Sequence, residues 1–131
     1  MRTVELEASV VSFLESDLVH THFRDHCLVG PSDVQAMFDA ISDGRDGRKV
    51  LLMVSVGDGT TMSNEARAYA SSEASNHYIA ADAIIVRDFG HQLAANVFVR
   101  HHKPSRPIQM FGDTASALAW LHTQRTLIQP I

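Results

Sequence analysis

At residues 50–56 the chain reads Val-Leu-Leu-Met-Val-Ser-Val, an almost wholly apolar run in which apolar and polar side chains do not alternate. A strand with one wet face would alternate with a period of two, so this segment is expected to be covered on both faces. Strands of that kind are typical of parallel sheets, because crossover helices pack on both sides. Residues 50–56 therefore predict a central strand of an α/β domain.

The residues after this strand repeat a pattern of strand and helix. Residues 80–86 form a second apolar run, and residues 107–111 form a short third one. Cap residues and proline predict where the intervening helices begin and end. The expected helices are one capped by Ser63, one from Gly90 to the residue before Pro104, and one capped by Asp113.

The residues before the central strand predict a hairpin and one further helix. Residues 3–14 alternate and then become mostly apolar, which indicates one or two strands. Residues 15–17 form a polar turn, and residues 18–23 are rich in β-forming side chains, so the two runs are expected to pair as an antiparallel hairpin. Pro31 is tolerated in a first helical turn, and apolar residues recur after it at helical spacing until Asp43-Gly44. These helical positions are Val34, Met37, Phe38 and Ile41.

The order of elements predicts the fold class. A hairpin and a helix followed by repeated strand-helix units imply an α/β sandwich whose mixed, mostly parallel sheet carries an antiparallel N-terminal edge. A chain of 131 residues fits one such domain. We expect a single domain over residues 1–124 and a C-terminal tail over 125–131, where no clear periodicity is found.

This pattern resembles the SpoIIAA-like, or STAS-like, domains of bacteria, and the resemblance extends from the hairpin through Leu121. It suggests an uncharacterised branch of the STAS/Sec14-like group, related to the C-terminal lobe of Sec14-like lipid carriers. The residues that carry it are Val50 to Ala70, especially Met62-Ser63-Asn64-Glu65-Ala66-Arg67, then Ala94, Asn96 and Phe98 through Lys103-Pro104, Pro107, Met110-Phe111, and Ala115 to Leu121 with Ala119-Trp120-Leu121.

The resemblance implies a regulatory role with a phosphorylated serine. In the anti-sigma-factor antagonists of this group, a partner kinase modifies a Ser at the N-terminus of the helix after the central strand. Ser63 stands at about that position, so it is a possible phospho-acceptor. The usual Asp-Ser-Ser-Gly run is replaced by Thr61-Met62-Ser63-Asn64. The alternative reading is that Ser63 only caps the helix, which is worth about 1 kcal/mol.

Composition excludes several classes of function. The formal charge is −4, which disfavours a nucleic-acid binder with a dominant basic field. The single cysteine, Cys27, permits neither an internal disulfide nor a thiolate zinc cluster. No run of 18 apolar residues predicts a membrane span, and the first residues do not resemble a secretory signal. We expect a cytoplasmic protein with no integral membrane association and no cofactor.

Eight histidines are the unusual feature of the composition, and their full protonation would reverse the sign of the net charge. His20 and His22 are two apart on an expected strand, so both rings project from one face and could chelate a metal with His26 or Asp17. The spacing matches no specific zinc signature, and a wet sheet face accommodates such side chains equally well. We therefore predict no metal site.

A cationic cluster is expected at the end of the helix that begins at Gly90. It consists of Arg100, His101, His102, Lys103 and Arg106. Cations at a helix C-terminus complement the negative end of its dipole, a contribution of about 0.3–1 kcal/mol. The functional alternative is a patch that binds an anion or a partner.

The loop after the central strand is the predicted recognition site, because open α/β sheets bind ligands there. Its residues are Gly57, Asp58, Gly59, Thr60, Thr61 and Ser63. The loop fits neither the Gly-x-x-x-x-Gly-Lys-Ser/Thr nor the Gly-x-Gly-x-x-Gly phosphate-binding pattern, which favours a flexible interaction loop.

Asp82 and Asp88 bracket the second apolar strand, where they either do acid-base work or end the strand.

These observations favour a non-enzymatic STAS-like regulatory or binding domain that recognises a protein partner or small ligand through this loop. The alternatives are a Sec14-like carrier of an apolar or lipid ligand and, less favoured, a small metal-assisted hydrolase. No nucleophile-elbow motif supports catalysis, and we expect no catalytic residues. A domain of this size would gain burial as a homo-oligomer.

Overall fold

A six-stranded mixed sheet organises the chain in the computed structural model, which describes residues 2–45, 47–70, 72, 77–86 and 106–128. The strands are β1 (Arg2–Glu5), β2 (Ser9–Glu15), β3 (Leu18–Phe23), β4 (Leu28–Val29), β5 (Val50–Val56), β6 (Thr61–Met62), β7 (Ile79–Ile85) and β8 (Ile108–Phe111). The helices are α1 (Pro31–Gly44), α2 (Asn64–Ala70) and α4 (Thr114–Thr123), followed by a 3₁₀ turn over Arg125–Leu127.

The sheet confirms the predicted fold class. Its strand order is β1-β2-β3-β5-β7-β8. The first three strands pair antiparallel, whereas β3, β5, β7 and β8 pair parallel. The central strand β5 therefore has a parallel neighbour on each side, as its continuous apolar run predicts.

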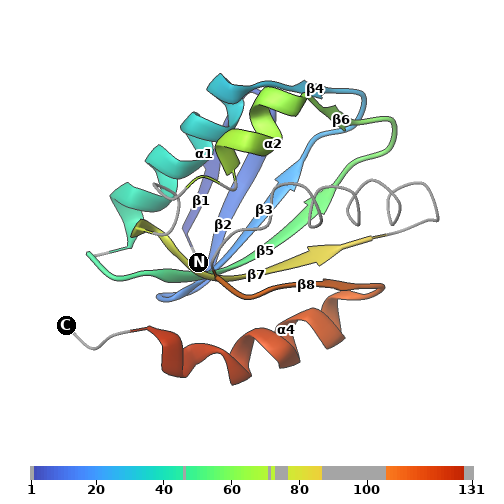
Figure 1. Cartoon of the computed structure of the whole chain (residues 1–131). Helices are drawn as coiled ribbons and strands as arrows, with labels where there is room; N and C mark the ends of the chain where they lie inside the picture. Colours follow the sequence, from blue (N-terminus) through green and yellow to red (C-terminus); the bar gives the residue numbers. More distant parts are fainter. Residues whose placement is uncertain (1, 46, 71, 73–76, 87–105, 129–131) are drawn as a thin grey trace.

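Helices cover both faces of the sheet. Figure 1 shows α1 and α2 on one face and α4 on the other. In β5, Leu52 belongs to the core beneath α1 and α2, while Leu51 and Met53 belong to the core over α4. All three side chains are at most 3% exposed. Two-sided burial is thus the physical reason why residues 50–56 show no alternation.

The first helix begins and packs as predicted. Pro31 occupies its first turn, and the Gly30 N–H donates to the Asp33 Oδ2 at 2.9 Å, which satisfies a backbone group just before the helix. The four predicted apolar positions are buried against the sheet together with Ala40. The spacing of i, i+3, i+4 and i+7 therefore identified the buried face of α1 correctly.

Two short strands were not predicted. β4 and β6 pair parallel in a separate two-stranded sheet, with Leu28 opposite Thr61 and Val29 opposite Met62. Residues 57–62, expected to be loop throughout, therefore end in a strand. A strand of two residues is too short to show any periodicity, which is why the sequence pattern misses it.

Two of the expected strands differ from the observed strands by one residue at one or both ends, and one expected helix cannot be compared with the structure. The strand expected at 80–86 spans Ile79–Ile85, and Pro107 precedes β8 instead of opening it. The helix expected from Gly90 to the residue before Pro104 lies outside the described residues. None of the helices in the described parts of the chain is long and apolar enough to cross a membrane.

The C-terminal helix is capped as predicted and leads into a bidentate ion pair. The Ser116 N–H donates to the Asp113 Oδ1 at 2.7 Å. Beyond α4, Arg125 donates from Nε and Nη2 to the two carboxylate oxygens of Asp17, at 2.6 and 2.8 Å. This contact joins the first residue of the expected tail to the turn of the N-terminal hairpin.

Candidate functional site

A pocket of about 330 Å³ lies between the sheet and helices α1 and α2. Its lining residues come mainly from α1 and α2 and from strands β3 to β8. The described lining residues are Phe23, Val29, Val34, Met37, Phe38, Leu52, Val54, Val56, Thr60, Thr61, Met62, Arg67, Ala70, Asp82, Ile84, Ile85, Val86, Arg106 and Ile108.

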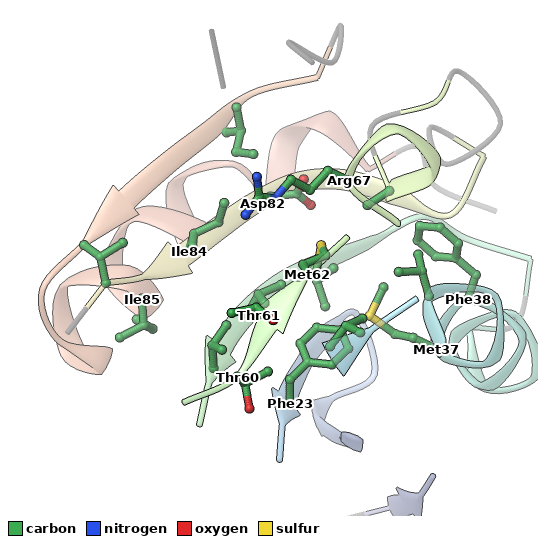
Figure 2. Close-up of a pocket in the computed structure, with 18 of the residues that line it drawn as sticks. Phe23, Met37, Phe38, Thr60, Thr61, Met62, Arg67, Asp82, Ile84 and Ile85 are labelled. Carbon is green, nitrogen blue, oxygen red and sulfur yellow. The ribbon is translucent and has the colours of Figure 1, made fainter. Parts of the chain in front are cut away.

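The lining is mostly apolar, with its polar groups at a few positions. Figure 2 shows Asp82 and Ile84 of β7 across the pocket from Met37 and Phe38 of α1. Thr60 and the two residues of β6 also reach it. A concave, mainly apolar space with a small number of polar groups is the usual character of a small-molecule site.

A buried ion pair supplies the main polar feature. Arg106 approaches the Oδ2 of Asp82 from Nε at 3.0 Å and from Nη2 at 2.9 Å, and the two side chains are 8% and 7% exposed. The Arg106 Nη2 also donates to the Ala70 carbonyl at 3.1 Å. Burial raises the pKa of Asp82 above its usual value, and the charge and hydrogen bonds of Arg106 oppose this shift.

The second oxygen of this carboxylate has no hydrogen-bond partner among the residues that the structure describes. Asp82 Oδ1 is buried, and no donor of the described residues reaches it. Leaving a buried acceptor unsatisfied typically costs about 1–3 kcal/mol, and more for a charged group. The pocket wall therefore contains an acceptor whose hydrogen-bonding capacity the fold itself does not use.

The pairing of Asp82 with Arg106 is not predicted from the sequence. Asp82 was expected to bracket a strand, but it lies within β7 and is 5% exposed. Arg106 is expected in a cationic cluster, and the structure shows its side chain buried against Asp82. One signal in the sequence could have indicated the pair, namely an acidic residue inside an apolar strand. A carboxylate buried there requires a positively charged or hydrogen-bonding partner. The other expected members of the cluster, Arg100, His101, His102 and Lys103, and also Asp88, lie outside the described residues.

The predicted loop after β5 divides into two parts. Thr60 is buried, and both Thr60 and Thr61 line the pocket. Asp58 and Gly59 are exposed and are not lining residues. The structure therefore brings two of the predicted loop residues to the pocket and leaves two on the surface.

This loop is fixed by hydrogen bonds to the turn after β3. The Asp58 N–H donates to the Asp25 Oδ1 at 2.8 Å. The Thr60 hydroxyl donates to the Arg24 carbonyl. These two bonds connect the loop between β5 and β6 to the turn after β3.

Ser63 acts as an N-cap. Its Oγ accepts from the Ala66 N–H at 3.1 Å, and its own N–H donates to the Val29 carbonyl at 3.0 Å. Ser63 is partly exposed and is not among the pocket's lining residues. The capping role predicted for this residue is confirmed, whereas its role as a phospho-acceptor stays a prediction.

The side chains of His20 and His22 in β3 both contact the hydroxyl group of Ser55. Both rings project from one face, as predicted, and Ser55 Oγ lies 2.7 Å from the His20 Nε2 and 2.8 Å from the His22 Nδ1. His26 lies apart from this pair on the next turn, where it has a φ of 55°. Among the described His, Cys, Asp and Glu residues, no group of three or more is placed to hold a metal ion.

Gly57 is predicted to be required for the close approach of the loop to the turn after β3. A Cβ at Gly57 would lie 2.2 Å from the Asp25 Oδ1 and 2.6 Å from the Asp25 N. We expect Gly57→Ala to lower the free energy of unfolding by about 1–3 kcal/mol in urea denaturation. Gly112→Ala is the matched control, because a Cβ there meets nothing within 4 Å. Equal stability of the two variants would contradict this account.

His20 is predicted to make stability depend on pH. Burial, followed by the nearby charge of His22, lowers the pKa of His20 below its usual value of 6.5. The folded state therefore takes up its proton less readily than the unfolded state, so stability present above pH 6.5 is lost as the pH falls through the folded pKa. Between pH 7 and 5, the free energy of unfolding should fall less steeply in His20→Gln than in wild type. The exposed His77→Gln is the control, and an unchanged slope in His20→Gln would contradict the assignment.

Comparison with known proteins confirms the expected fold and assigns the family. The chain is similar to a solved structure from Shewanella loihica PV-4, an uncharacterized protein of the DUF3478 family with a SpoIIAA-like fold. The identity is 16%, the TM-score is 0.59, and the match covers 92% of this chain and 99% of that one. No curated protein matches the sequence. Residues 12–125 match the family described as a domain of unknown function, DUF7793, and the chain therefore belongs to that family.

Proposed function

We propose that this chain is a non-enzymatic STAS-like binding domain that takes up a small, mostly apolar ligand in the pocket beneath α1 and α2. The observation that carries the proposal is the pocket itself. Its volume of about 330 Å³ falls in the range of small-molecule sites, and its walls are mostly apolar. A buried apolar ligand would gain about 25 cal/mol for each Å² of apolar surface removed from water.

The position of the pocket in the sheet supports this function. Val54 and Val56 lie toward the carboxyl end of β5, and Ile84 and Ile85 lie at the carboxyl end of β7. Ligands of open α/β sheets bind at that edge, where the connecting loops converge. The pocket therefore joins the predicted recognition loop, through Thr60, to the apolar cavity expected of a Sec14-like carrier.

The chemistry of the lining favours binding over catalysis. Asp82 is the acidic group of the described lining, and its Oδ2 is engaged by Arg106. A general acid or base must exchange its proton with the reacting group, which a carboxylate held by an arginine does poorly. Apolar contact and hydrogen bonding are what these walls offer.

A protein partner is the second candidate, and one observation favours it. Leu28 of β4 is 71% exposed and pairs with Thr61 of β6 next to the exposed Asp58 and Gly59. A large apolar side chain in such a place is suited to a contact with another protein.

The ligand proposal predicts that filling the pocket abolishes binding. Val54→Phe adds a ring to the wall, so the affinity for naphthalene, a wholly apolar probe, should fall at least about tenfold. Naphthalene fluorescence on titration with protein measures this directly. Val10→Phe is the matched control, because Val10 is half-buried and is not a lining residue. Failure of the wild-type protein to bind naphthalene, or equal binding by Val54→Phe, would reject the proposal.

The partner proposal predicts that Leu28→Asp removes an interaction without changing the fold. Affinity capture from the native cell should recover a protein with wild type that is absent with Leu28→Asp, while both chains unfold at the same temperature. Gln35→Asp, on the exposed surface of α1, controls for the added charge. A capture profile that Leu28→Asp leaves unchanged would remove this candidate.

A further inference from the structure

The two oxygens of Asp82 have unequal roles in the pocket wall. Oδ2 accepts from the Arg106 Nε at 3.0 Å and lies 2.9 Å from the Arg106 Nη2, whereas Oδ1 receives no hydrogen bond from the described residues. A carboxylate accepts hydrogen bonds at both oxygens. The ion pair therefore engages Oδ2, and Oδ1 is a buried acceptor of a side chain that lines the pocket.

The neighbours of Asp82 in the sheet are apolar. It is opposite Leu52 of β5 on one side and Ile108 of β8 on the other, and all three residues line the pocket. A carboxylate in such surroundings is shielded from water, which strengthens a hydrogen bond to it and raises the cost of leaving it unmade. Apart from Arg106, the side chains placed beside Asp82 in this part of the wall are apolar.

We propose that the pocket selects apolar molecules that carry a neutral hydrogen-bond donor, a hydroxyl or an N–H, and that Asp82 Oδ1 is the acceptor for this group. The inference rests on the proposed ligand-binding function and specifies its ligand class. The donor is neutral because Arg106 already balances the charge of Asp82. An ammonium group would bring a second positive charge against a carboxylate that is already paired with Arg106.

The test compares two ligands that differ only in the donor. 2-Naphthol carries a hydroxyl, and in 2-methoxynaphthalene a methyl group replaces the hydroxyl hydrogen. Isothermal titration calorimetry at pH 7 should show 2-naphthol binding wild type at least about tenfold more tightly, the usual effect of a hydrogen bond to a charged group. This comparison needs no variant, so it does not depend on how well any substituted chain folds.

A variant assigns the selectivity to Asp82. In Asp82→Asn the oxygen can still accept from Arg106, and the NH₂ group would then face the pocket as a donor to either ligand. The ratio of the two affinities should therefore fall to about one. Asp17→Asn is the matched control, since Asp17 also pairs with an arginine, Arg125, but does not line the pocket. It should keep the wild-type ratio.

The outcomes separate this inference from the function on which it rests. If wild type binds neither naphthalene nor 2-naphthol, the ligand-binding function is wrong. If it binds 2-naphthol and 2-methoxynaphthalene equally, the pocket is a site for apolar ligands and the donor requirement is overturned. Tighter binding of 2-naphthoate than of 2-naphthol would also overturn it, because the anion would then be recognised by Arg67 or Arg106. A folded Asp82→Asn that keeps the wild-type ratio would show that another group is the acceptor.

Discussion

Burial of the central strands on both faces is the constraint on which the remaining architecture depends. β5 and β7 have apolar side chains on each side, so neither face of the sheet can be left to water. The helices α1 and α2 cover one face and α4 covers the other (Figure 1). The antiparallel β1 and β2 then extend the sheet beyond β3, where the chain begins.

The pocket is a local departure from this two-sided packing. Beneath α1 and α2 the side chains of β5 are fully buried at Leu52 but only half-buried at Val54 and Val56, toward the carboxyl end of the strand. The buried carboxylate of Asp82, which is opposite Leu52, and the guanidinium of Arg106 stand in the same mostly apolar lining. A buried ion pair contributes little to stability compared with apolar packing, so stability alone does not explain its placement at the cavity.

Much of the fold could be predicted from the sequence because its signals are local. The run at 50–56, the spacing of Val34, Met37, Phe38 and Ile41, and the Asp113 cap each lie within a few residues and indicate one element. The candidate site was harder to predict. Thr60 and Thr61 were assigned to it, but the partnership of Asp82 and Arg106 joins residues 24 positions apart and has no periodicity.

The sequence by itself determined the fold class, the six strands of the main sheet taken as a hairpin edge and three later strands, and the buried face of α1, since hydrophobic period and cap residues express them directly. Tertiary structure alone decided the pairing of β4 with β6, the meeting of His20 and His22 at Ser55, and the unpartnered oxygen of Asp82. These features depend on which strands become neighbours and in which register. Register is a property of the assembled sheet, and no single segment of the chain encodes it.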